Sequence, residues 1–151
     1  MTTIYLETLI AAPKNVCFDL SRNIDFHMTS MKGSGEQAID GRTSGLIEKG
    51  EFVTWEATHF LVRQRLSSRI TEMVKPDYFV DEMIEGIFKS IWHKHSFIQF
   101  DEKTLMRDEF RYKVPFGFIG KIVDAILLKK YMKHLLVKRN LALKEAAESN
   151  S

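Results

Sequence analysis

Five consecutive β segments followed by one long helical pattern are the feature that most restricts how this chain can fold. The segments alternate in hydrophobicity and are separated by turn residues such as Lys75-Pro76-Asp77, and Pro115 ends the last of them. We expect strands near residues 51–61, 64–74, 78–85, 89–100 and 104–114. Such regular spacing predicts an antiparallel meander.

The residues before the meander predict one more long strand, two short helices and a short strand. Residues 2–11 alternate between two faces, as a half-buried strand does. Pro13 suits the first turn of a helix, and Asn23 can cap a second short helix. Five of the eight glycines fall within residues 33–50, which indicates a short strand near residues 36–39 followed by a turn-rich loop.

Residues 118–148 predict a single helix with an apolar face wide enough to cover a sheet. That face consists of Ile119, Ile122, Val123, Ile126, Leu127, Met132, Leu135, Leu136, Leu141 and Leu143. The whole order predicts an α+β fold, with a seven-stranded antiparallel sheet wrapped around the long C-terminal helix. A strongly twisted sheet cannot pack flat along a helix, so we expect a cavity between them. We expect one domain over residues 1–148 and a disordered tail at 149–151.

Three stretches of the sequence carry a family resemblance. The opening APKNVCFDLSRN is similar to the first strand-to-helix junction of the SRPBCC superfamily, which includes START lipid-transfer domains, pollen-allergen-like proteins and polyketide cyclases. The run from GRTSGLIEKGEF to KSIWHKHSF, with TLMRDEFRYKVPFGFIGKI beyond it, resembles a bacterial polyketide cyclase/dehydrase-like or cell-division-inhibitor-like subgroup. The resemblance covers essentially the whole chain and implies the helix-grip fold, which hosts carriers, sensors and enzymes alike.

Strand alternation predicts which side chains face the cavity and so could bind a ligand. The polar ones are His59, His93, His95 and Asp108, and either Asp81 or Glu82 joins them. The apolar ones are Trp55, Phe79, Met83, Phe97, Met106, Phe110 and Tyr112, with Ile122 and Ile126 from the helix.

The polar cluster admits three roles. Its members can satisfy one another, or pair with Arg65 or Arg69, purely to support the fold. They can also anchor a ligand. In the third role, one of the three histidines acts as a general base and Asp108 or Glu82 orients it, as a cyclase or dehydratase would require.

The segment His93-Lys94-His95 raises the question of a metal. It places two imidazoles on one face of a strand, a spacing that a zinc site can use. No cysteine joins the cluster, and so short a motif arises often by chance. We therefore expect no metal and no cofactor.

The net charge conceals an asymmetry. The chain has 22 Lys+Arg and 20 Asp+Glu, and a net charge of only +2 does not indicate a nucleic-acid partner. Residues 118–148 carry seven basic and three acidic residues, so this segment is +4 and the remainder −2. Such a helix is either a solvated outer face above a buried stripe, or makes weak contact with an anionic membrane or a protein.

The only cysteine, Cys17, cannot form an internal disulfide, which fits a reducing compartment. The N-terminus lacks the basic and apolar regions of a signal peptide. We therefore expect a cytoplasmic carrier or sensor of a small apolar or amphipathic ligand. The alternatives are a cyclase/dehydratase-type enzyme, or a membrane-surface or protein-interaction module. The patterns do not predict an oligomeric state.

Overall fold

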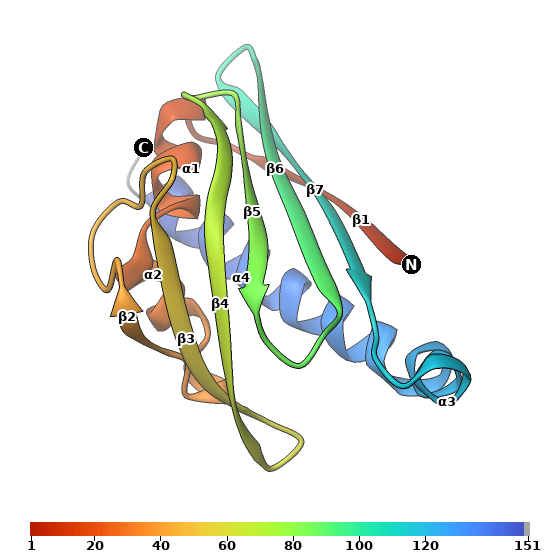
Figure 1. The fold of residues 1–151 in the computed structure, drawn as a ribbon. Coiled ribbons are helices and arrows are strands. Elements are labelled where there is room, and N and C mark those ends of the chain that lie inside the picture. The colour runs from red at the N-terminus through yellow and green to blue at the C-terminus, as the bar shows by residue number, and fades with distance from the viewer. Residues whose placement is uncertain (150–151) are drawn as a thin grey trace.

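The computed structural model describes residues 1–149, and within them one antiparallel sheet of seven strands lies against a long helix (Figure 1). The strands are β1 (Thr2–Ile10), β2 (Gln37–Gly41), β3 (Phe52–His59), β4 (Val62–Val74), β5 (Tyr78–Glu85), β6 (Ser90–Phe100) and β7 (Lys103–Lys113). Their order across the sheet is β1-β7-β6-β5-β4-β3-β2. Strands β3 to β7 therefore form the expected meander, β2 pairs with β3 at one edge, and β1 pairs with β7 at the other.

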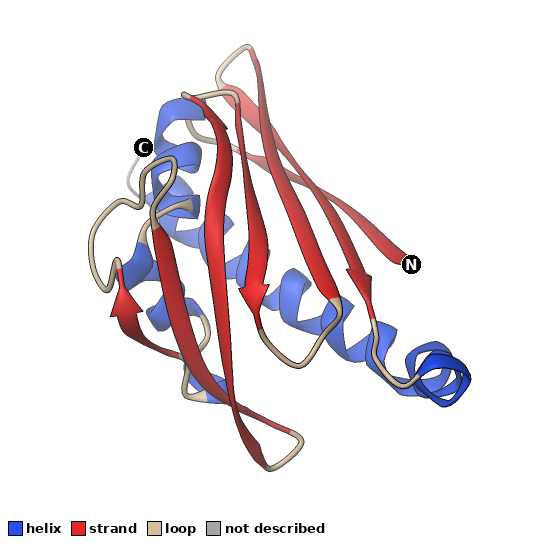
Figure 2. Cartoon of the chain, viewed as in Figure 1, coloured by secondary structure: helices blue, strands red, loops and turns tan. Residues whose placement is uncertain are grey.

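Burial alternates along the strands as the sequence pattern predicts. In β6, Ile91, His93, His95 and Phe97 are buried while the residues between them are only partly so. The same alternation runs along β7 and β3. The sheet therefore has one face directed at the helices, which Figure 2 shows lying together on one side of the strands.

Two short helices follow β1, as expected. They are α1 (Lys14–Ser21) and α2 (Ile24–Ser30), and a single 3₁₀ turn, η1 (Lys32–Ser34), comes after them. The side chain of Asn23 caps α2 by accepting a hydrogen bond from the backbone N–H of Phe26 at 3.0 Å.

The C-terminal helical segment is continuous but not uniform. It consists of α3 (Gly117–Val123), a π-helical turn η2 (Asp124–Leu128) and α4 (Lys129–Ser149), where one regular helix was expected. Figure 1 shows that α3 does not continue the axis of α4, and a π turn is an established cause of such a bend. None of the helices within residues 1–149 is both long and apolar enough to cross a membrane.

Asp124 holds the start of this segment to the sheet. The side chain is buried, and it accepts hydrogen bonds from the hydroxyl of Tyr112 on β7 and from that of Thr2 on β1. Ser149 belongs to α4, so the expected disordered tail does not include it. The other two residues of that tail lie outside the described residues.

The core divides into two apolar clusters on the helix-facing side of the sheet. The larger contains Phe18 of α1, Phe79, Phe97 and Met106 of the strands, and Leu143 of α4. The smaller is formed by Ile4, Ile91, Phe110, Tyr112 and Leu136.

Because the strands are antiparallel, successive connections fall at opposite ends of the sheet (Figure 1). At one end, which we call the α1 end, lie the β4–β5 and β6–β7 turns, and Lys14 of α1 forms an ion pair with Asp77 of the first of them. The opposite end, the α3 end, carries the β3–β4 turn, the β5–β6 loop and the segment that leads from β7 into α3.

Candidate functional site

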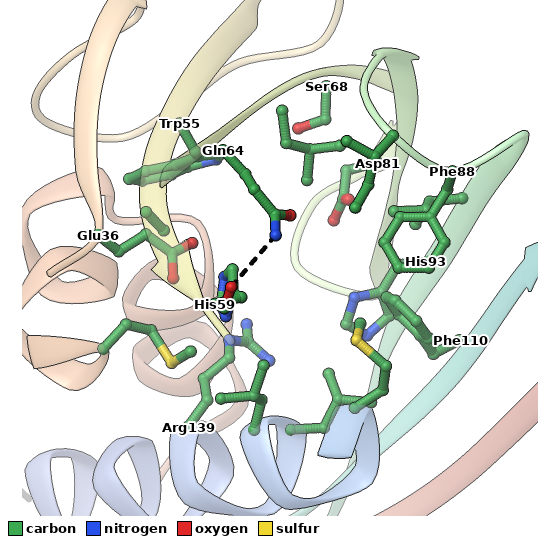
Figure 3. A pocket seen from close by; sticks show the side chains of 18 of the residues that line it. Glu36, Trp55, His59, Gln64, Ser68, Asp81, Phe88, His93, Phe110 and Arg139 are labelled. Atoms are coloured by element: carbon green, nitrogen blue, oxygen red, sulfur yellow. Dashed lines mark hydrogen bonds between the residues drawn. The ribbon is translucent and has the colours of Figure 1, made fainter. Parts of the chain in front are cut away.

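A cavity of about 860 Å³ lies between the curved sheet and α4. Its wall is mainly apolar, and polar side chains enter it from two sides (Figure 3). Of the residues predicted to line it, six do so: Trp55, His59, Phe79, His93, His95 and Phe110. These six residues could be predicted because successive side chains of a strand point to opposite faces of the sheet.

Seven other residues expected at the cavity are not part of its wall. Phe97, Met106 and Tyr112 fill the core, and Met83 packs beside the smaller cluster. Asp108 lies behind His93. Ile122 and Ile126 are 45% and 69% exposed, because the bend and the π turn change the phase of the helix ahead of α4.

The register of β5 decides which acidic residue faces the cavity. Asp81 lies opposite His93 and Phe79 lies opposite His95, so these four share one face. Glu82 lies opposite Trp92 and Arg69 on the outer face. Asp81 therefore lines the cavity, and Glu82 is corrected from a site residue to a residue of the outer surface.

The cavity ends at a set of interacting polar residues that we call the polar floor: Asp81, His93, His95, Asp108, Arg139 and Asn140. His93 Nε2 donates to Asp108 Oδ1 at 2.7 Å, and Asn140 Nδ2 donates to Asp108 Oδ2 at 2.7 Å. Burial would raise the pKa of Asp108, but the hydrogen bond from His93 and the charge of Arg139 hold it well below its usual range. Asp108 is therefore a buried carboxylate.

His95 is fixed in its neutral form. Its Nε2 donates to Asp81 Oδ2 at 2.7 Å, its Nδ1 accepts from Arg139 Nη2 at 3.4 Å, and its ring stacks on Phe79. Burial lowers the pKa of His95 to about 4, and Arg139 acts in the same direction. Burial would raise the pKa of Asp81, but the hydrogen bond from His95 lowers it overall.

Arg139 and Asn140 were not predicted at the site. Arg139 is one of the seven basic residues counted over residues 118–148, but it is buried and donates to Ser21 Oγ at 2.7 Å. The available signal is their position one turn from Leu136 and Leu143, which are both buried. Arg139 lies 3.7 Å from Asp108 Oδ1, so it takes the role proposed for Arg65 or Arg69.

A second polar group lies on the opposite wall, as Figure 3 shows for Glu36, His59 and Gln64. His59 Nδ1 is 2.6 Å from the Tyr131 hydroxyl, and Gln64 donates to the His59 carbonyl. Glu36 is 2.9 Å from Nε2 of His27. Burial would raise the pKa of Glu36, but this hydrogen bond and the charge of His27 lower it overall. Glu36 and Tyr131 were also missed: Glu36 directly precedes the short edge strand β2, for which no inward-facing residues were predicted, and Tyr131 lies on α4.

Asp81, His93 and His95 each bring one potential metal ligand atom to within 4.8 Å of the others. Two features oppose a cation there. Both imidazoles already use Nε2 to bond a carboxylate, and the Arg139 guanidinium lies 3.4 Å from His95 Nδ1. The donor set is therefore better suited to hydrogen bonding than to a metal.

No protein-family model matches this chain, and no curated protein matches it. Solved structures do. A protein from Thermus thermophilus has a TM-score of 0.80 at 16% identity, covering 99% of both chains. A START superfamily protein from Mycobacterium smegmatis has a TM-score of 0.74 at 12% identity over 99% of both chains. For the ginseng major latex-like protein 151 from Panax ginseng the TM-score is 0.71 at 14% identity, over 97% of both chains.

These similarities establish the fold. The chain has the helix-grip fold, as the sequence resemblance implied, with the sheet and the long C-terminal helix in the arrangement of START and major latex-like structures. Sequence identities of 12–16% support a shared architecture only. The function depends on the residues of the site.

Proposed function

We propose that the protein binds a small amphipathic ligand, as a carrier or sensor, in the cavity between the sheet and α4. The observation that carries this proposal is the cavity itself. Its volume of about 860 Å³ lies in the range typical of small-molecule sites, and its wall is mainly apolar, with two polar groups on opposite sides. A ligand that has an apolar body and one hydrogen-bonding group suits such a wall.

The polar floor supports a single defined orientation for that ligand. Among the hydrogen bonds of the described residues, none uses Nδ1 of His93, although its ring lines the cavity. In the neutral tautomer that donates from Nε2 to Asp108, the lone pair is on Nδ1, which can then accept a hydrogen bond. We therefore propose a ligand hydroxyl or amide N–H as its partner.

The test uses Nile red, an uncharged apolar dye, and the fluorescence of Trp55. The chain has two tryptophans; Trp55 lines the cavity, whereas Trp92 lies on the outer face beside Arg111. In a Trp92→Phe background, Trp55 reports on the cavity alone. We expect saturable binding of Nile red with a change in Trp55 emission.

A matched pair of changes on α4 locates the dye, with dye fluorescence as the readout. Leu136 lines the cavity and Leu141 is exposed on the same helix. Leu136→Trp fills part of the cavity and should weaken Nile red binding by at least about tenfold, equivalent to about 1.4 kcal/mol. Leu141→Trp should leave it unchanged. Equal effects of the two changes, with both variants folded, would contradict the proposal.

Acid–base catalysis is the second candidate, and the His93–Asp108 pair favours it. A carboxylate that orients an imidazole, with the other ring nitrogen free in a cavity, is the arrangement a general base requires. His95 does not fit that role because both its nitrogens are engaged. The probe is exchange of the α-protons of cyclohexanone in D₂O, followed by NMR. Exchange above the buffer rate that is lost in His93→Gln would support catalysis, and its absence would oppose it.

We further propose that the protein works in a reducing compartment, the cytoplasm. Cys17 is fully buried and free, and burial raises the pKa of its thiol, so it behaves as a small core residue. The core role of Cys17 is tested by measuring the thermal midpoint with and without a thiol reductant. The two midpoints should be equal.

A further inference from the structure

The α3 segment exposes an unusual amount of apolar surface. Phe116, Phe118, Ile119 and Ile126 are 81%, 78%, 70% and 69% exposed. Ile122, Val123 and Leu127 in the same segment are also exposed. Single exposed apolar residues are ordinary, but a contiguous set of this kind marks an interaction surface.

The other two connections at the α3 end are apolar as well. The two-residue turn between β3 and β4 is Phe60–Leu61, with Leu61 99% exposed, and Ile87 of the β5–β6 loop is exposed. Phe60 and Leu61 have φ angles of 51° and 66°, a left-handed conformation that hairpin turns normally give to Gly or Asn. Two large apolar residues at such positions make the turn less stable. This indicates that their side chains have a functional role.

These connections meet around the cavity. Phe60, Ile87, Phe116 and Ile119 all line its wall, and all four are exposed to solvent. Phe60 also lies against Tyr131 of α4, with 4.4 Å between ring centroids. The apolar surface of the α3 end therefore surrounds an opening of the cavity.

Positive charge borders this surface. A groove of about 440 Å³ is lined by Lys89 of the β5–β6 loop, Lys113 at the end of β7 and Lys121 of α3, one lysine from each neighbouring segment. The acid in the groove, Asp124, is already bonded to Tyr112 and Thr2. Lys129, Lys130 and Lys133 are exposed just beyond the π turn. Lysines that surround an apolar patch can extend their amines to anionic groups while the patch is covered.

We infer that the α3 end docks on an anionic phospholipid bilayer. Its exposed apolar side chains enter the interfacial region, and the lysine groove binds lipid phosphates. A second copy of the chain fits less well, because a two-fold contact through this face would bring the like-charged grooves of the two copies close together. The inference rests on the exposed surface and not on the cavity's ligand. Its test is therefore independent of the proposed function.

The test is co-sedimentation with phosphatidylcholine vesicles, with or without about one-third phosphatidylglycerol. We expect the protein to bind the anionic vesicles more tightly. Lys113→Gln/Lys121→Gln should reduce that binding about thirtyfold, since each lysine near a charged surface contributes about 1 kcal/mol. Leu61→Asn/Phe118→Asn should reduce it at least about tenfold. Leu61 and Phe118 are not part of the cavity wall, so Nile red binding should be retained.

The control pair is Val74→Asn/Phe100→Asn, which removes two exposed apolar side chains at the α1 end. This pair should bind vesicles like the wild type. Three results would overturn the inference: no preference of the wild type for anionic vesicles, an equal loss in the control pair, or a stable dimer in sedimentation velocity that Leu61→Asn/Phe118→Asn dissociates.

Discussion

The polar floor and the α3 end reverse the usual distribution of side chains. In the floor, Asp108 and Arg139 are charged and buried; at the α3 end, Leu61 and Phe118 are apolar and exposed. The buried charges are held by one another, whereas the exposed apolar groups contribute little to folding. The contrast teaches that stability depends on the first region and not on the second. Mutations should therefore separate the two.

The largest expected effect is that of Asp108→Ala. The change leaves the Arg139 guanidinium buried without its nearest carboxylate and removes the acceptor of His93 and Asn140. We expect the free energy of unfolding to fall by about 3–5 kcal/mol, measured by urea denaturation. Asp108→Ala/Arg139→Met should recover part of this loss because no unpaired charge remains. A double variant no more stable than Asp108→Ala would contradict this account.

A smaller effect is expected from pH. The folded state lowers the pKa of His95 from 6.5 to about 4, so between these values the unfolded chain binds more protons. The free energy of unfolding should therefore fall by about 2–3 kcal/mol as the pH drops from 7 to 4. The lowered pKa values of Asp81 and Asp108 add a further loss at still lower pH.

Urea denaturation at a series of pH values measures this dependence. His95→Asn provides the comparison, because it removes the titrating imidazole and keeps a side chain that can hydrogen-bond. Its stability should vary much less between pH 7 and 4. An unchanged pH dependence in this variant would show that another group is responsible.

The smallest effects belong to the α3 end. Phe118→Asn should change the free energy of unfolding by less than about 0.5 kcal/mol because its side chain is largely exposed. Leu61→Asn should increase stability by a few tenths of a kcal/mol, about 0.5 at most, since Asn tolerates the left-handed conformation at φ 66° better than Leu. Thermal melts of the two single variants measure both. A large destabilisation by either would mean that the α3 end supports the fold after all.

The strand arrangement could be predicted from the sequence, and about half of the residues predicted at the cavity line its wall. A period of two is a local property, so it places His93, His95 and Phe110 on the inner face without knowledge of the rest of the molecule. The choice between Asp81 and Glu82 could not be made in this way. It depends on how β5 pairs with β6, and strand pairing is a tertiary property.

The helix was harder to predict for a different reason. A regular period of 3.6 puts Ile122 and Ile126 on the same face as Leu136, but the π turn between them interrupts that period. The burial of Arg139 depends on Asp108, which lies 31 positions earlier in the chain. No window of local sequence contains both partners, so an ordinary amphipathic pattern conceals the ion pair.

The alternation of connections between the two ends of the meander has a consequence for engineering. The β3–β4 turn and the β5–β6 loop can be exchanged without moving the inward-facing residues of β6 and β7. Access to the cavity and recognition at its floor are thus separable design variables. A library restricted to residues 60–61 and 87 would vary the rim of the cavity and leave the polar floor unchanged.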